Sequence, residues 1–258
     1  MPPKCAGLNG RSLHFAITGT ATMGFLLFGY DQGVMSGLIS LSHFIQFFTA
    51  AGEGSEYHQN LIQATITAVY ELGCLLGAIY TLMFGDRTGR RWTIIPGACV
   101  MIIGVIIQVT SWWDEVQLAQ FMVGRVITGV GNGMNTATIP TYQAECSKPH
   151  KRGLHICIEG GTVAIGTLIS YWIDYGVHWI SPKATIADFV WRFPIAFQIV
   201  FGLIIIFGML VLPESPRWLL TKERLTEGEY VIAALEGKEI EDPDVQREKD
   251  LALESIQA

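Results

Sequence analysis

Six apolar segments, each long enough to cross a bilayer, constrain the fold of this chain more than any other feature. A helix needs about 20 residues to cross the roughly 30 Å hydrocarbon core of a membrane. Of the 258 residues, 50% are hydrophobic and 16% charged, against about a quarter charged in a soluble domain. The sequence therefore predicts an all-α membrane protein whose six-helix part, residues 14–212, has spans near 14–37, 61–83, 93–112, 117–140, 155–176 and 192–212.

Basic residues alternate between the connecting loops and predict the orientation of the spans. One set of loops holds Lys4 and Arg11, then Arg87, Arg90 and Arg91, then Lys148, Lys151 and Arg152, then Arg217, Lys222 and Arg224, whereas the opposite loops hold only Lys183. Basic loops stay in the cytoplasm. We therefore expect a multi-pass protein, of the plasma membrane, with both ends cytoplasmic and with Trp112, Trp113, Trp179 and Trp191 in an aromatic belt at the outer boundary.

The chain becomes acidic and polar after Val211. Residues 1–13 are expected to form a cytoplasmic N-terminus, and residues 213–258 a cytoplasmic helical segment. Ser215 before Pro216 predicts one helix start, and Asp242 before Pro243 predicts another. Between them, Thr226 with Glu229 predicts a capping box for a helix that ends near Gly237.

Several classes of function lack their usual sequence signals. The five cysteines are scattered and form no C-x-x-C pair, and no H-E-x-x-H occurs, so no metal site is predicted. The glycine run at 129–133 lies inside an apolar helix, where small-residue packing is the better interpretation than a nucleotide-binding turn. Outside short loops the sequence has no basic face, so nucleic acid is not expected as a partner. We expect neither an enzyme nor a bound cofactor.

One acid, Asp31, lies within the first apolar span. An ionised carboxylate at the centre of a membrane helix costs roughly 2.5–3.5 kcal/mol on insertion scales, so it is a functional hypothesis by default. Arg125, on a helix running the opposite way, is its natural partner, because the two lie about 6 Å apart in depth at 1.5 Å per residue. The glycines at 29, 33 and 37 form a different face, suited to close helix contact.

Charged residues also gather at the cytoplasmic ends of the helices. The loop after the second span holds Asp86, Arg87, Arg90 and Arg91; Glu145 and Arg152 flank the end of the fourth span; Glu214 and Arg217 follow the sixth. These repeated acids and bases predict a network that latches one conformation and breaks in another. The simpler alternative is ordinary positive-inside charge.

Taken together, the motifs resemble the sugar porter family of the major facilitator superfamily, and the residues between them resemble its fungal members. The motifs are Gly29-Tyr30-Asp31…Ser36-Gly37, Gly85-Asp86-Arg87-x-Gly89-Arg90-Arg91, Gly124-Arg125-x-x-x-Gly129-x-Gly131-x-Gly133, Pro140-x-Tyr142-x-x-Glu145, Arg152-Gly153 and Pro213-Glu214-Ser215-Pro216-Arg217. The resemblance implies alternating-access transport of a sugar-like substrate across a lipid bilayer, with inverted three-helix repeats in each six-helix half.

The resemblance also implies roles for individual residues. Asp31 is similar to the proton acceptor of proton-coupled members, and Arg125 would tune it, so the proton is the expected coupling ion. Phe28, Glu159 and Thr167 are expected to line the substrate site. Gly160 and Thr167 stand where sugar-binding relatives usually present glutamines, which argues against a simple hexose and leaves related polyols, disaccharides and acids open as substrates.

The sequence supplies one six-helix half of such a transporter. We expect a truncated N-terminal half, which needs the missing C-terminal half or a second copy to form a complete transporter. The alternative is a non-transporting protein on the same fold, either a sugar sensor or receptor, or an inactive half.

Overall fold

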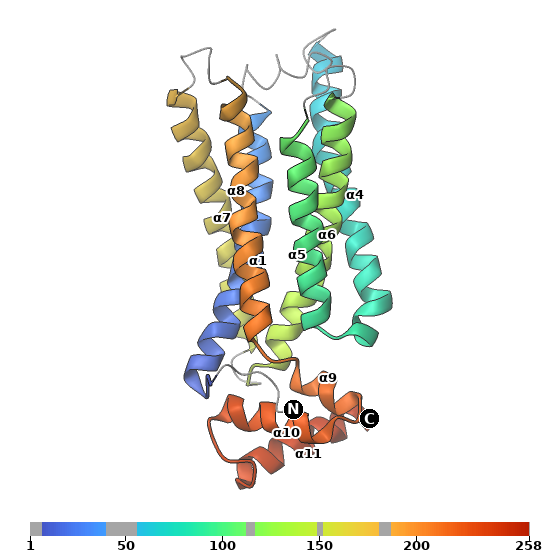
Figure 1. Cartoon of the computed structure of the whole chain (residues 1–258), viewed down its shortest axis with the longest axis vertical. Coiled ribbons are helices and arrows are strands. Elements are labelled where there is room, and N and C mark those ends of the chain that lie inside the picture. Colours follow the sequence, from blue (N-terminus) through green and yellow to red (C-terminus); the bar gives the residue numbers. More distant parts are fainter. Residues whose placement is uncertain (1–6, 40–55, 112–116, 149–151, 181–186, 258) are drawn as a thin grey trace.

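The computed structural model describes residues 7–39, 56–111, 117–148, 152–180 and 187–257. Within these residues, six long helices stand side by side, and three short helices lie beneath one end of them (Figure 1). The long helices are α1 (Arg11–Leu38), α4 (Glu56–Thr88), α5 (Arg91–Val109), α6 (Gln117–Glu145), α7 (Arg152–Ile180) and α8 (Ala187–Val211). Each expected span overlaps one of these helices.

Five of the six long helices, α1, α4, α5, α7 and α8, are long and apolar enough to cross a membrane. The exception within the described chain is α6, which carries several glycine, asparagine and threonine residues. Its composition follows from its place, because α6 packs against both α4 and α5 and also touches α1 and α7. A helix so enclosed needs small residues for close contact and can bury polar groups against its neighbours.

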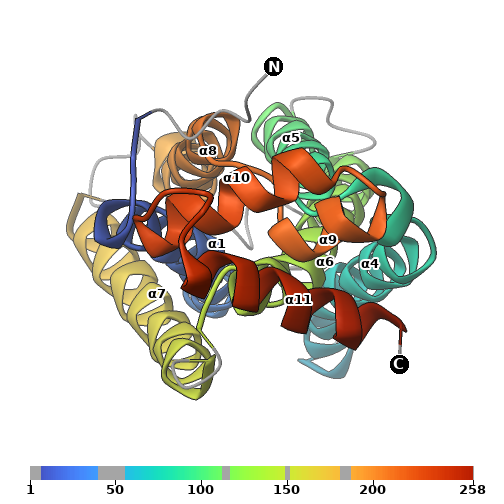
Figure 2. The same cartoon turned by 90° about the horizontal axis from the view of Figure 1, so that it is seen from below.

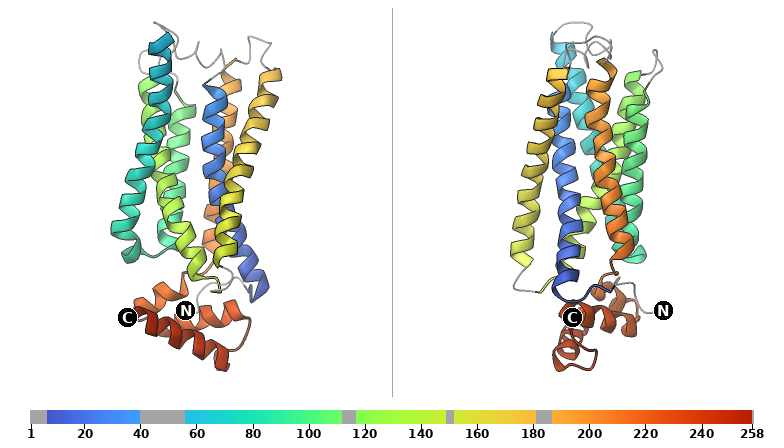
Figure 3. Two further views of the ribbon diagram at one scale, coloured as in Figure 1. Left: turned by 180° about the vertical axis from the view of Figure 1, so that it is seen from behind. Right: turned by 60° about the vertical axis from the view of Figure 1, so that its left-hand side comes forward.

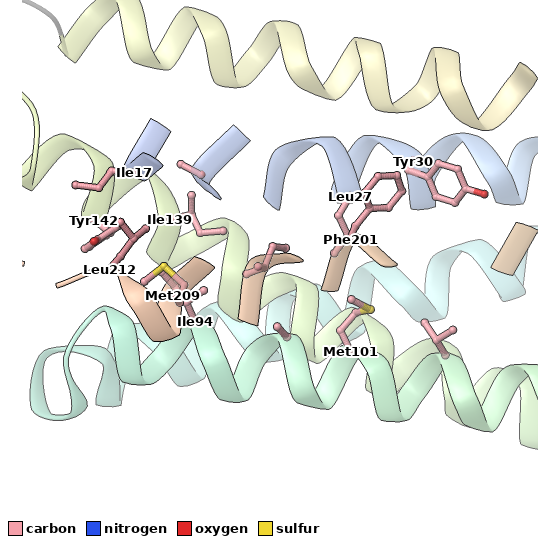
Figure 4. Close-up of a cluster of buried hydrophobic side chains, with 14 of the residues drawn as sticks. Ile17, Leu27, Tyr30, Ile94, Met101, Ile139, Tyr142, Phe201, Met209 and Leu212 are labelled. Atoms are coloured by element: carbon pink, nitrogen blue, oxygen red, sulfur yellow. The ribbon is translucent and has the colours of Figure 1, made fainter. Parts of the chain in front are cut away.

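The bundle consists of two groups of three helices. In one group α1 packs along α7, and in the other α4 packs along α6 (Figure 3). The third helix of the first group is α8, and the third helix of the second group is α5. The two groups are joined by the contact of α5 with α8 and by that of α1 with α6. Buried apolar side chains from α1, α5, α6 and α8 fill the space between them, among them Leu27, Met101, Ile139 and Phe201 (Figure 4).

Glycines allow the close contacts of α1 with α7 and of α6 with α4. A Cβ atom at Gly29 of α1 would overlap the carbonyl oxygen of Val163 in α7, and one at Gly129 of α6 would overlap that of Tyr70 in α4. Close backbone contact between helices is favourable in a membrane because it maximises van der Waals packing. The predicted packing role of both glycine runs is confirmed.

The three short helices, α9 (Pro216–Thr221), α10 (Leu225–Glu236) and α11 (Pro243–Gln257), form a layer across the end of the bundle (Figure 2). A small apolar cluster holds this tail together and includes Leu220, Ile232 and Val245. Among the contacts that tie it to the bundle, Gly10 N donates to Ala234 O at 2.7 Å, Lys148 pairs with Glu236 at 2.6 Å, and Trp218 Nε1 donates to Asp86 O at 2.9 Å.

Two of the predicted helix starts in the tail are confirmed and one is wrong. Ser215 Oγ accepts from Trp218 N, and Asp242 Oδ1 accepts from Asp244 N. The capping box is wrong, because α10 already begins at Leu225, so Thr226 lies inside its first turn and Glu229 instead binds Lys249. The predicted end at Gly237 is confirmed by its left-handed backbone (φ 68°).

The expected aromatic belt is only partly formed. The side chain of Trp179 is 69% exposed, as a belt residue should be. Trp191 is 1% exposed, so it does not face the surface of the bundle as a belt residue should. It lies on the side of α8 that faces the bundle and packs edge-on against Phe121 at 6.3 Å between ring centroids. Trp112 and Trp113 lie outside the described residues.

Candidate functional site

A buried ion pair lies where α1 and α6 meet. Arg125 Nη1 donates to Asp31 Oδ1 at 2.8 Å, and the two side chains are 1% and 0% exposed. The same carboxylate oxygen accepts a second bond at 2.8 Å from Nε2 of Gln198 on α8. Three helices, α1 and α8 from one group and α6 from the other, therefore bring polar side chains to one carboxylate.

An aromatic ring supports the cation of this pair. The Arg125 guanidinium lies 4.4 Å from the ring centroid of Tyr70 on α4, and Asn132 Nδ2 donates to the Tyr70 hydroxyl at 3.0 Å. A ring face attracts a cation more strongly where water is excluded. Removing either charge alone from such a buried pair leaves the other uncompensated. The arrangement holds an arginine inside the bundle in one defined position.

The pairing of Asp31 with Arg125, predicted from their depths, is confirmed by this contact. Gln198 and Tyr70 were not found from the sequence. Gln198 did leave a signal, because it is the one amide side chain in the apolar run of α8. Tyr70 left none, since an aromatic residue is common in a membrane span.

A second polar cluster lies at the tail end of the bundle. Arg90 bridges two helices there, since its Nη1 lies 2.6 Å from Asp86 Oδ1 in α4 and its Nη2 lies 3.1 Å from Glu145 Oε1 at the end of α6. A second bond, from Arg90 Nε to Glu145 Oε2 at 3.3 Å, makes the contact with Glu145 bidentate. This geometry is more specific than a single point contact.

Glu214 closes the same cluster from the segment after α8. Its carboxylate accepts from the backbone N–H groups of Arg90 and Arg91 at 3.0 Å, and so caps the first turn of α5. Gly89 makes this approach possible, because its φ is 95° and an added Cβ would press on the Glu214 carboxylate. Burial raises the pKa of Glu214, while the backbone N–H donors act in the opposite direction.

The remaining residues of the expected network differ in their placement. Arg91 Nη2 donates to the carbonyl of Leu210 at 2.9 Å. Arg87 and Arg217 are exposed. Arg152 begins α7, but its side chain lies outside the described part of the structure. The loop after α4 thus binds both acids, Glu145 through a side chain and Glu214 through the backbone.

The three expected substrate-lining residues do not form one cluster. Phe28 is partly exposed on α1, whereas Glu159 on α7 is 4% exposed. Thr167, about 12 Å further along α7 at 1.5 Å per residue, has its hydroxyl within hydrogen-bond distance of two carbonyl oxygens, Gly29 O at 3.0 Å and Val163 O at 3.1 Å. That hydroxyl is therefore used in the contact between α1 and α7.

Comparison with known proteins supplies the family. A family model described as "Sugar (and other) transporter" matches residues 17–258. The chain belongs to this sugar transporter family. It has the all-helical fold of one half of a major facilitator, corresponding to the N-terminal half of the sugar porters, and is an integral membrane protein.

Individual relatives place the chain within the family. It is 42% identical over 252 residues to the "Sugar transporter STL1" of Saccharomyces cerevisiae, covering 97% of this chain and 43% of that protein. It is 39% identical to the "Major facilitator superfamily transporter mfsA" of Aspergillus fumigatus, covering 90% of this chain and 43% of that protein.

A solved structure shows the same fold. The proton:xylose symporter XylE, with bound 6-bromo-6-deoxy-D-glucose, matches with a TM-score of 0.80 and 25% identity, covering 95% of this chain and 52% of XylE. A partially occluded, inward-open XylE structure from E. coli matches with a TM-score of 0.82 and 26% identity, covering 94% of this chain and 58% of that one. The chain thus spans about half the length of the proteins it matches.

Proposed function

We propose that this chain acts as the N-terminal half of a proton-coupled transporter for a sugar or a related polyol. The observation that carries the proposal is the buried pair of Asp31 and Arg125, with Oδ1 and Nη1 2.8 Å apart. The names of two relatives, a sugar transporter and a proton:xylose symporter, agree with it. The proposal includes a plasma-membrane location, cytoplasmic termini and a second six-helix half that completes the transporter.

Asp31 would accept the coupled proton. A neighbouring cation favours the charged form of an acid, and removal from water favours the neutral form. Protonation would cancel the attraction to Arg125 and leave Gln198 as the donor to Asp31 Oδ1, which can remain bonded to a neutral carboxyl group. The contact between α1 and α6 would then weaken, and this change would be coupled to the movement that exposes the site to the other side.

The cytoplasmic cluster would act as the gate. Arg90 joins α4 to α6 through Asp86 and Glu145, and Glu214 joins the start of α5 to the tail. Opening the bundle at this face would break these contacts, so they would stabilise one of two conformations.

Radiolabelled uptake in transporter-deficient yeast tests the proposal. We would express the chain alone and as a chimera in which the C-terminal half of STL1 follows residue 258. The chimera is expected to accumulate a sugar or polyol against its gradient, and Asp31→Asn is expected to abolish that accumulation while exchange across the membrane continues.

Uphill accumulation that is unchanged in Asp31→Asn would refute the proton role. Sugar binding without uptake by the chimera would instead support a non-transporting sensor. Uptake by the chain alone would show that it works without the C-terminal half, through a second copy.

A further inference from the structure

Two polar residues next to the buried ion pair are themselves at least partly exposed at the surface of the bundle. Gln32 follows Asp31 on α1, and Glu71 follows Tyr70 on α4. Asp31 and Tyr70 are buried, whereas Gln32 is partly exposed and Glu71 exposed. Gln32 Nε2 donates to Glu71 Oε1 and so connects the two helix groups.

The position of Glu71 is costly for a purely structural residue. It lies midway along the 33-residue α4, and exposed leucines such as Leu72, Leu75 and Leu76 surround it. An ionised side chain at this depth is stable only beside water or polar partners. Because Gln32 occupies one carboxylate oxygen and the side chain is exposed, acceptor lone pairs remain for a ligand.

Other ligand-binding side chains lie beside this pair. Phe28, Gln32 and Ser36 are spaced four residues apart and therefore share one face of α1, and each is at least partly exposed. The Tyr171 hydroxyl of α7 donates to Ser36 Oγ at 3.4 Å. One stripe thus offers an aromatic ring, an amide, two hydroxyls and a carboxylate.

The stretch of α7 from Gly160 to Thr167 offers fewer polar side chains to a ligand than this stripe does. A Cβ atom added at Gly160 or Gly161 would meet nothing within 4 Å, so the helix presents bare backbone there. Thr167, as described above, has its hydroxyl bonded to Gly29 and Val163. Between α1 and α4, by contrast, Gln32 and Glu71 both carry polar side chains that are at least partly exposed.

We propose that Gln32 and Glu71 form a hydroxyl-binding subsite for a neutral polyhydroxylated substrate. This inference rests on the proposed function and narrows its substrate class. Glu71 accepts hydrogen bonds from hydroxyl groups, Gln32 both donates and accepts, and Phe28 packs against the C–H face of the substrate. The charge of Glu71 repels anions, so sugar acids are excluded.

Uptake and binding by the chimera with the STL1 C-terminal half test the subsite. The probes are D-glucose, D-xylose, D-sorbitol and glycerol, with gluconate as a competing anion. Glu71→Gln and Gln32→Leu are each expected to raise the KM of the transported probe about tenfold or more, with Vmax changed less than twofold. Glu71→Gln is also expected to make gluconate a better competitor, which a merely structural role would not do.

Leu82→Ala, at a residue of α4 that is 82% exposed, is the matched control and should leave KM unchanged. Surface abundance of each variant identifies a folding failure, and equilibrium binding to the purified chimera gives the same comparison without transport. Uptake or binding whose KM or Kd is unchanged in both variants overturns the subsite while the proposed function stands. If the folded unmodified chimera neither transports nor binds any of the four probes, both proposals fail.

Discussion

The two glycine contacts, α1 with α7 and α6 with α4, are copies of one design. Gly124, Gly129 and Gly133 repeat the spacing of Gly24, Gly29 and Gly33 one hundred residues later. The partners repeat as well: a Cβ at Gly166 of α7 would overlap the carbonyl of Leu26, and one at Gly73 of α4 would overlap that of Val126. The same offset relates Leu26 to Val126, as the inverted repeats of transporters require.

The copies differ where the chemistry lies. The position equivalent to Asp31 in α6 is Gly131, and a Cβ there would overlap the backbone of Gly97 and Met101 in α5. No side chain can occupy that place. The position equivalent to Arg125 in α1 is Phe25, which packs against the apolar core. The repeated glycines therefore supply the scaffold, and the ion pair arises from two positions at which the copies differ.

The largest expected effect comes from breaking the ion pair of Asp31 and Arg125, two positions at which the copies differ. Arg125→Met leaves Asp31 buried without its counterion and is expected to reduce the free energy of unfolding by about 3–5 kcal/mol. Asp31→Asn combined with Arg125→Met should recover most of that loss. Unfolding of the purified chain in detergent measures both, and equal losses in the single and double variants would contradict an energetic coupling of the pair.

The next test asks whether the two glycine contacts are equivalent. Gly29→Val and Gly129→Val each drive a side chain into a facing carbonyl, and overpacking of this kind costs about 1–3 kcal/mol. Similar losses of thermal stability are expected for the two. Gly160→Val, where the added Cβ meets nothing within 4 Å, is the matched control. A large loss of thermal stability at one glycine and none at the other would show that the two contacts contribute unequally to stability.

The smallest expected effect concerns Glu214, which caps the first turn of α5. Helix α5 packs against α6, one of the two helices of the α4–α6 contact. Because burial raises the pKa of Glu214 above its ordinary value of 4.5, the folded chain binds this proton more tightly than the unfolded chain. The resulting stabilisation is present below pH 4.5 and is lost as the pH rises through the raised pKa. Glu214→Gln should flatten this part of the stability profile, measured as unfolding midpoints from pH 4 to 8 in steps of about half a unit. Parallel profiles would contradict the assignment.

Much of the scaffold follows from the sequence because hydropathy and glycine spacing are local signals. Apolar runs located all six long helices, and the glycine face of α1 identified the surface that meets α7. The pairing of Asp31 with Arg125 followed from depth alone. These features depend on one helix at a time, or on the single coordinate along the membrane normal.

Features that depend on the rotation of one helix against another could not be predicted. Gln198 binds Asp31 because α8 turns that side of itself toward α1. Trp191 is buried for the same reason, although its depth suits a belt. At the tail end, the sequence predicted a network of charges but not which of them pair, and the structure pairs Glu145 with Arg90 from another helix. Sequence distance is a poor guide where helix ends converge.

The tail also has a mechanical consequence. It is fastened at Gly10 to the start of α1, at Lys148 to the segment after α6, and at Asp86 to the end of α4. It therefore spans both helix groups, and a rocking motion that separates them at this face must stretch or release the tie. If the attachment at Asp86 were released in that motion, the indole N–H of Trp218 would lose its hydrogen-bond acceptor.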